Sequence, residues 1–495
     1  MNIQIEYLAA FIAFGFIVTY LLIPVAKRLA IVYGLVSYPG GRKIHDGAIP
    51  VLGGPAIFAP QVILFVIYVY LLITDSSLIA HDRIPKFLSL FVGTTWILVL
   101  GTIDDWIKLG WRKKLLGQLL GISILLVGGN TIGKIVVPFY GLTDLGLFGY
   151  LLFGFIVLVI TNAVNLIDGM DGLAAGICLF AAITCGILGF NRGYMFVTAI
   201  CFTTVGSLLA FLRFNFPPAS IFMGDSGSLA LGFMLSALAT SDIVTGSSQR
   251  YTSLTTFVAL LLPFAIALMD VALSVARRWI SGRKIFLPDA GHIHHRFMEM
   301  FQRRRLVVGI FYIFSALFCT VTLLINFNPE SYFPLIIAGL VISVLVALMA
   351  VVLRINRIDR ITTSIKNRHD CQFLSTFNTY MEGRLRRVKS HDELVALLEV
   401  GVRDLDFDTV EVSSNGFKPY TWKNNRDVHP DSPRKNGHRA FNSSELSVKW
   451  VVPTHDDPSY QKYLELVWWR FLNVVEERSR ELNDVGASVD EKSSP

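Results

Sequence analysis

Charged residues are scarce in this 495-residue chain, at 16% of the total. An ordinary soluble domain has about 25%, so one soluble globular fold is excluded, although the length would suit roughly three such domains. Cysteine is scarce as well, with five in all. Four of them lie inside apolar runs, where cysteine behaves as a small buried hydrophobic residue, so no disulfide framework is indicated.

Hydrophobic residues make up 53% of the chain, and the long apolar runs all lie within residues 1–354. Eleven runs approach the roughly 20 residues that a membrane-spanning helix needs. They cover residues 5–26, 51–74, 86–103, 115–130, 148–165, 172–190, 195–213, 226–241, 256–276, 306–326 and 334–354. The first is too long for a cleaved signal peptide and lacks its basic start. We predict an all-α polytopic membrane protein of about eleven transmembrane helices, followed by a small cytoplasmic α+β C-terminal domain.

Lysine and arginine are concentrated in one alternating set of the loops between these runs, by about threefold over the other set. This bias predicts that the N-terminus faces outside and that the C-terminal region lies in the cytoplasm. The net charge of +7 is partly this topology signal. Because no aromatic-interleaved basic stripe accompanies it, we predict no nucleic-acid partner.

The loops on the predicted cytoplasmic side carry dense polar or glycine-rich patterns, whereas the outer loops do not. The first such loop holds Arg42-Lys43 and His45, followed by Gly53-Gly54. Alone, it is equally typical of a basic membrane-surface loop. The second holds Asp104-Asp105 at the end of an apolar run. Acidic residues are unfavourable at a helix C-terminus, so this pair indicates function or metal binding more than structure.

The third loop holds amide and carboxylate side chains at every third position. Asn162, Asn165, Asp168 and Asp171 recur at a predicted membrane boundary. Until the glycine at position 169 this spacing keeps their oxygen atoms near one helical face. Oxygen ligands suit Mg²⁺, which binds through one or two carboxylates plus substrate phosphate. Helix capping is the alternative, and it would explain one or two of the four residues.

The fourth loop is Gly224-Asp225-Ser226-Gly227, directly before an apolar run. Glycine permits close backbone approach, and the amides of a helix N-terminus can bind phosphate. Aspartate is also a common N-cap, so this motif alone is weak.

The fifth loop is rich in histidine and arginine, with His292, His294, His295 and Arg296 close together. Zinc is the rival interpretation, but the spacing lacks both an i, i+4 histidine pair and a cysteine partner. Contact with phosphate or with the uridine of a nucleotide is favoured. Asp270 lies inside the ninth predicted span, where a carboxylate is costly and usually functional or paired. Arg277 is a candidate partner.

Together, these five motifs resemble the polyprenyl-phosphate N-acetylhexosamine-1-phosphate transferases, over about residues 5–325. The His-Ile-His-His form is similar to the branch that uses UDP-GlcNAc or a related UDP-amino sugar, of the O-antigen or teichoic-acid-initiating type. The chain departs from the family where Lys108 replaces the third acid of an Asp-Asp-x-x-Asp pattern. This puts a further acidic ligand at that position in doubt.

The resemblance implies a reaction in the bacterial plasma membrane between a UDP-amino sugar and undecaprenyl phosphate, giving a lipid-linked sugar diphosphate and UMP. It implies Mg²⁺, with Mn²⁺ as the alternative, held by Asn165 and Asp225. Asp104 and Asp105 would orient or deprotonate the lipid phosphate, and Asp168 and Asp171 would shape the site. The residues that would contact phosphates or nucleotide are Lys43, His45, Lys114, Asn162, His292, His294, His295 and Arg296.

We divide the polar C-terminal region into three predicted segments. Residues 355–385 are predicted to form a basic helical linker at the membrane surface, residues 386–484 an α+β domain faintly similar to GAF-type modules, and residues 485–495 a disordered tail. Strands are predicted at residues 409–412 and 449–452, and an amphipathic helix at residues 461–482. A regulatory role and a role in forming a homo-oligomer remain open alternatives.

Two other functions compete with the transferase. A transporter predicts ionisable residues near mid-span and internal repeats, but Asp270 is the main such residue and no repeat is evident. A CDP-alcohol phosphotransferase would need an Asp-Gly-x-x-Ala-Arg signature, whereas residues 168–173 lack the Ala-Arg pair.

Overall fold

The structure is a computed structural model of the whole chain. It describes residues 2–37, 48–74, 83–137, 140–240, 252–280, 293–328, 333–352, 368–405, 407, 409–414, 417–423, 434–441, 446–453, 464–478 and 481. Two compact units are present. One comprises Met1–Ser274 with Asp289–Arg354, and the other comprises Val275–Pro288 with Ile355–Pro495. We keep residue 354 as the proposed end of the membrane domain.

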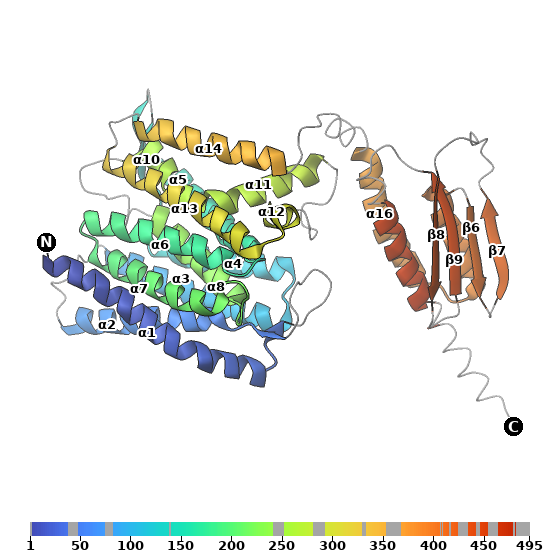
Figure 1. Cartoon of the computed structure of the whole chain (residues 1–495), viewed down its shortest axis with the longest axis horizontal. Helices are drawn as coiled ribbons and strands as arrows, with labels where there is room; N and C mark the ends of the chain where they lie inside the picture. The colour runs from blue at the N-terminus through green and yellow to red at the C-terminus, as the bar shows by residue number, and fades with distance from the viewer. Residues whose placement is uncertain are drawn as a thin grey trace. The chain divides into compact units, whose positions relative to one another are not determined.

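The first unit is a bundle of apolar helices (Figure 1). Its elements are α1 (Asn2–Val32), α2 (Gly53–Thr74), α3 (Ile84–Ile107), α4 (Trp111–Val127), α5 (Gly146–Ile167), α6 (Leu173–Asn191), α7 (Met195–Asn215), α8 (Gly224–Thr240), α10 (Leu254–Ala259), η3 (Leu262–Phe264), α11 (Ala265–Ile280), α12 (Ile293–Phe301), α13 (Arg304–Phe327) and α14 (Phe333–Val352). Each predicted apolar run contains helix, and among the described residues eight helices are long and apolar enough to span a membrane. The predicted class, a polytopic helical membrane protein, is confirmed.

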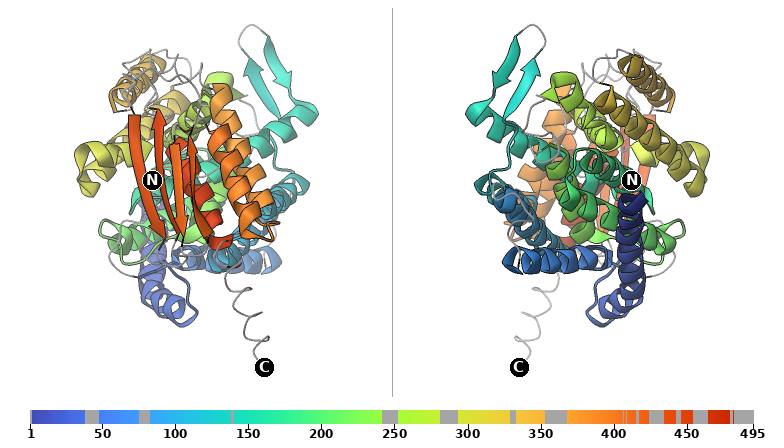
Figure 2. Two further views of the ribbon diagram at one scale, coloured as in Figure 1. Left: turned by 90° about the vertical axis from the view of Figure 1, so that its right-hand side faces the viewer. Right: turned by 90° about the vertical axis from the view of Figure 1, so that its left-hand side faces the viewer.

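Two small sheets accompany these helices in the described part of the chain. β1 (Val36–Ser37) pairs antiparallel with β2 (Ile49–Pro50). β3 (Lys134–Val137) and β4 (Gly141–Asp144) form a hairpin between α4 and α5, and β5 (Thr252–Ser253) joins β3 in parallel. Figure 2 shows this hairpin projecting from the helices.

Helix α8 is the most enclosed element of the bundle. Every residue from 226 to 240 is buried, which explains its glycine, alanine and serine content, because small residues let helix backbones approach closely. A Cβ atom added at Gly101 of α3 would lie 2.5 Å from the carbonyl oxygen of Asp225. One added at Gly54 of α2 would lie 2.4 Å from the amide nitrogen of Gly227. Glycine at these two positions therefore lets α2 and α3 pack on the start of α8.

The second unit is α+β. It contains α16 (Arg368–Leu385), α17 (His391–Asp404), a helix over residues 464–478 and a four-stranded antiparallel sheet in the order β7-β6-β9-β8. The strands are β6 (Thr409–Ser414), β7 (Phe417–Lys423), β8 (Arg434–Phe441) and β9 (Leu446–Pro453). The predicted strands and the predicted amphipathic helix are all present. One face of the sheet, with Val410 and Trp450, packs in a core with Trp468 and Phe471 of that helix. Residues 485–495 lie outside the described residues.

Candidate active site

A cavity of about 560 Å³ lies where the ends of α3, α5 and α7 meet the start of α8. Four carboxylates line it, from Asp105, Asp168, Asp171 and Asp225. Asn165 joins them, and Lys108 and Arg304 are the two basic residues in the lining. Three of the predicted polar loops therefore meet at one place, although 120 residues of sequence separate Asp105 from Asp225.

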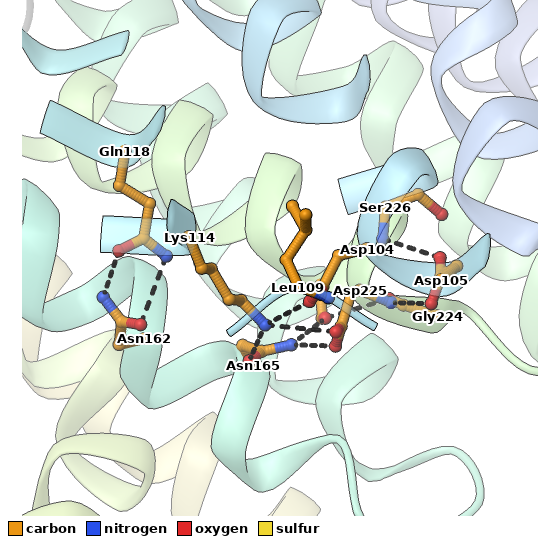
Figure 3. Close-up of polar contacts among 11 residues, drawn as sticks. Asp104, Asp105, Leu109, Lys114, Gln118, Asn162, Asn165, Gly224, Asp225 and Ser226 are labelled. Atoms are coloured by element: carbon orange, nitrogen blue, oxygen red, sulfur yellow. Dashed lines mark hydrogen bonds and ion pairs between the residues drawn. The ribbon is translucent and has the colours of Figure 1, made fainter. Parts of the chain in front are cut away.

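Lys114 is the centre of a hydrogen-bonded network at the edge of this cavity (Figure 3). Its Nζ lies 2.9 Å from Asp104 Oδ2 and 3.1 Å from Asp225 Oδ2, and it donates to Asn165 Oδ1 at 3.2 Å. Asn165 Nδ2 in turn donates to Asp225 Oδ1 at 2.6 Å and to Ser228 Oγ at 2.9 Å. One ammonium group thus holds three of the five predicted motif segments together and offsets two carboxylates.

Asp105 receives the first amides of α8. Its Oδ1 accepts from the Asp225 N–H at 2.9 Å, and its Oδ2 accepts from the Ser226 N–H at 3.0 Å (Figure 3). A protein carboxylate thus occupies these two amides, and the predicted contact between the start of α8 and phosphate stays a prediction. An anion at a helix N-terminus is stabilising, so Asp105 fixes the start of α8 beside the cavity.

The chain turns sharply directly after α3. Lys108 has a left-handed backbone with φ of 52°, and its N–H bonds to the Asp104 carbonyl. Asp104 is 4% exposed, and its Oδ1 accepts from the Leu109 N–H at 2.6 Å. Asp104 therefore stabilises this turn while facing Lys114, and the turn places Lys108 in the cavity wall.

Asn162 lies one turn before Asn165 and is paired with an amide side chain. Gln118 Nε2 donates to Asn162 Oδ1 at 3.2 Å, and Asn162 Nδ2 donates back to Gln118 Oε1 at 2.9 Å. Asn162 is not among the described residues that line the cavity. Its observed role is to join α4 to α5, while its predicted contact with substrate stays a prediction.

Asp168 and Asp171 lie beyond the end of α5. Shielding from solvent raises the pKa of the Asp168 carboxyl well above its usual range, and the nearby carboxylates of Asp225, Asp105 and Asp171 raise it further. Asp171 Oδ2 accepts from the Ala219 N–H at 3.1 Å and lies 3.6 Å from Arg304 Nη1. The cavity therefore concentrates negative charge that a bound cation would relieve.

The donor set fits a hard divalent cation in the manner of magnesium. Among the residues that the structure describes, no three carboxylate, imidazole or thiol groups form a ready-made metal cluster. Mg²⁺ rarely uses such a cage, since it keeps several waters and binds one or two carboxylates with substrate phosphate. Asn165 and Asp225, the ligands that the family resemblance implies, adjoin each other and both line the cavity.

The predicted basic and histidine loops are described in part. Arg42, Lys43, His45 and His292 lie outside the described residues. His294, His295 and Arg296 lie in the first turn of α12, and Arg296 is exposed. Met298, in the same helix, lines the cavity, so α12 borders it.

Several cavity residues were missed by the sequence analysis. Arg304 lies between two other arginines and was counted only as a topology signal, whereas it faces Asp171. Lys108 was noted only as a departure from a family pattern. Asn215 at the end of α7 lines the cavity, and its side chain binds Gly172 N–H at 2.9 Å and the Ile221 carbonyl at 2.8 Å. Asparagine near a helix end is too common to be recognised from sequence.

An acid-lined cavity at one end of a multi-pass helical bundle defines a membrane-embedded protein with a polar site. Residues 87–242 match the family model described as Glycosyl transferase family 4. A probable undecaprenyl-phosphate N-acetylglucosaminyl 1-phosphate transferase of Bacillus subtilis is 34% identical over 322 residues, covering 64% of this chain and 84% of the relative. The chain belongs to the polyprenyl-phosphate GlcNAc-1-phosphate transferase family.

Two other relatives have names that specify a different lipid phosphate or a different sugar. A decaprenyl-phosphate N-acetylglucosaminephosphotransferase of Mycobacterium tuberculosis is 31% identical over 346 residues, covering 66% of this chain and 85% of the relative. A phospho-N-acetylmuramoyl-pentapeptide-transferase of Acetivibrio thermocellus is 31% identical over 324 residues, covering 62% and 90%. The comparisons thus support a phosphosugar transferase.

Proposed function

We propose that the chain transfers an N-acetylhexosamine-1-phosphate, GlcNAc-1-phosphate before others, from a UDP-sugar to undecaprenyl phosphate. The products are a lipid-linked sugar diphosphate and UMP, and the reaction is the first membrane step of envelope polysaccharide assembly. The names of the relatives support the polyprenyl phosphate and the sugar phosphate. The observation that carries the proposal is the convergence of four carboxylates and Asn165 on one cavity.

In this reaction an oxygen of the lipid phosphate forms a bond to the β-phosphorus of the UDP-sugar, while the bond from that phosphorus to the oxygen of UMP breaks. Phosphate has a second pKa near 6, so the nucleophile is mostly ionised at neutral pH. The greater difficulty is to bring two anions together. Positioning and charge neutralisation therefore dominate the catalysis that the protein must supply.

The residues around the cavity have separable roles in this scheme. Mg²⁺, or Mn²⁺ in its place, would be held by Asn165 and Asp225 and would neutralise the diphosphate. Lys108 and Arg304 bring positive charge to the cavity wall and would contact phosphate oxygens. Asp105 keeps the start of α8 in register through two amide bonds. Asp104 forms an ion pair with Lys114. Asp104 or Asp105 would orient or deprotonate the lipid phosphate.

An assay with purified protein tests the reaction and the metal together. With radiolabelled UDP-GlcNAc, undecaprenyl phosphate and Mg²⁺ in detergent, we expect labelled lipid and UMP to form in equal amounts. Excess EDTA should reduce both to background, and added Mg²⁺ should restore them. UMP release at an unchanged rate in EDTA would refute the metal. Parallel reactions with UDP-GalNAc and other UDP-amino sugars would identify the donor, and failure of all of them would refute the transferase.

We further propose that the cavity faces the cytoplasm of a bacterial cell and that the N-terminus lies outside, as the lysine and arginine bias predicts. In a Cys371→Ser background, Lys113→Cys tests the inner side and Asp144→Cys the outer side, since both native side chains are exposed. The other four cysteines are buried. A membrane-impermeant maleimide should label position 144 in intact cells and position 113 only after permeabilisation. The reverse pattern would overturn the orientation.

A further inference from the structure

Asp270 is a carboxylate enclosed within α11. It is 1% exposed, and its Oδ1 accepts a hydrogen bond from the Ile293 backbone N–H at 2.6 Å. Ile293 is the first residue of α12, where backbone N–H groups have no partner inside the helix. A carboxylate satisfies such a group and also interacts favourably with the helix dipole. Asp270 therefore caps α12 from a different helix, 23 residues earlier in the chain.

The remainder of α12 is anchored by aromatic packing. Phe297 is fully buried, with its ring centroid 5.0 Å from that of Phe311 in α13 and 5.9 Å from that of Phe301. The next residue, Met298, lines the cavity. Apolar packing restrains the middle of this helix, but it is less directional than a hydrogen bond. The bond from Asp270 supplies a directional polar contact at the first residue of the helix.

This helix start carries the predicted phosphate-contacting and nucleotide-contacting residues. His294, His295 and Arg296 follow the bonded amide by one to three positions. A shift of the first turn would therefore move all three, together with the cavity wall at Met298. A charged acceptor suits this task, since a buried carboxylate without its partner is costly and so strongly favours the one arrangement that satisfies it.

We propose that Asp270 is a positioning residue, which fixes the first turn of α12 at the cavity and thereby determines the affinity for the UDP-sugar. It acts through the backbone of Ile293 and does not itself touch the reacting groups. The proposed effect on substrate affinity rests on the function proposed above. The cap itself does not.

Two substitutions at this position separate the loss of the hydrogen bond from the loss of the charge. Asp270→Ala removes the acceptor, whereas Asp270→Asn retains a side-chain oxygen that can accept from Ile293. Ser274→Ala is the control, because Ser274 lies one turn further along α11 and is also buried, at 3% exposed. Hydrogen exchange measured by mass spectrometry tests the cap in the absence of substrate. The measured quantity is the rate of amide exchange in peptides that contain residues 293–301 in their interior.

We expect Asp270→Ala to accelerate amide exchange in residues 293–301 by about tenfold or more, the size expected for losing a hydrogen bond to a charged group. Exchange in α3, α5 and α8 should stay unchanged, and Asp270→Asn and Ser274→Ala should remain close to the parent protein. Unchanged exchange at residues 293–301, or accelerated exchange throughout the bundle, would overturn the proposal.

Steady-state kinetics test the functional part. Asp270→Ala should raise KM for the UDP-sugar by about tenfold, with a smaller change in kcat and no change in KM for the lipid phosphate. Asp270→Asn should recover most of the loss. Equal KM values in all variants, alongside local loosening of α12, would refute the positioning role. If the parent protein transfers no sugar phosphate at all, the function proposed above is refuted. The hydrogen-exchange result still tests whether Asp270 caps α12.

Discussion

Asp225→Asn is expected to reduce transfer by at least about a thousandfold, the upper range for losing one charge-stabilising group from an active site. Both carboxylate oxygens are engaged, one by Lys114 at 3.1 Å and the other by Asn165 at 2.6 Å. Asparagine keeps the shape but removes the charge that would hold the cation. Because the substitution is nearly isosteric, the protein should still insert and fold. UMP release at saturating Mg²⁺ measures the effect.

The matched control is Asp144→Asn in β4. That carboxylate is 64% exposed and is not among the residues that line the cavity. We expect transfer within about twofold of the parent rate, because surface substitutions away from such features have small effects. Detergent gel filtration should show the same elution for all three proteins. Near-normal transfer by Asp225→Asn would reject its role as a metal ligand.

Local spacing in the sequence predicted the part of the site that lies on one continuous segment. Asn162, Asn165 and Asp168 recur at three-residue intervals. Asn165, near the end of α5, and Asp168, directly after it, line the cavity, whereas Asn162 pairs with Gln118. The long apolar runs likewise predicted the helices, because a membrane span must satisfy its own backbone hydrogen bonds and be apolar along its length. Both signals can be read from neighbouring residues alone.

Pairings across the bundle could not be predicted in this way. Acids at the end of α3 were judged unfavourable from the dipole of that helix alone. The structure resolves the conflict with a second helix, since Asp105 accepts from the Asp225 amide at the N-terminus of α8, 120 residues later in the chain. The favourable interaction of Asp105 with the dipole of α8 opposes its unfavourable interaction with the dipole of α3. A rule applied to α3 alone leaves out the stabilising contribution of α8.

The contact of Asp270 with α12 is a second pairing that could not be predicted from the sequence. The cost of this carboxylate inside a span correctly marked it as paired or functional, and a nearby arginine in sequence, Arg277, was the natural candidate. One donor among the described residues is a backbone amide, that of Ile293, whereas the side chain of Arg277 lies outside the described residues. Every residue except proline carries such a group, so the sequence has no signal that distinguishes this one. Its identity depends on how α11 and α12 pack.

Lys114→Met is expected to lower both stability and transfer. The ammonium lies between Asp104 and Asp225, whose side chains are 5% and 29% exposed, and its removal leaves two carboxylates facing each other. Loss of one partner from a buried ion pair costs about 3–5 kcal/mol, and the exposure of Asp225 favours the low end. The apparent melting temperature in detergent should fall clearly, and transfer should fall by at least about a hundredfold. Lys113→Met, one residue earlier and exposed, should change neither.

A double substitution distinguishes a structural lysine from one that also serves the reaction. Asp104→Asn added to Lys114→Met removes the unpaired carboxylate as well, so much of the lost stability should return. Transfer should stay low, because Asp225 and Asn165 would still lack the ammonium that orients them. Recovery of stability and activity together would mean that Lys114 only offsets Asp104. Recovery of neither would mean that Asp104 contributes through the Leu109 amide more than through Lys114.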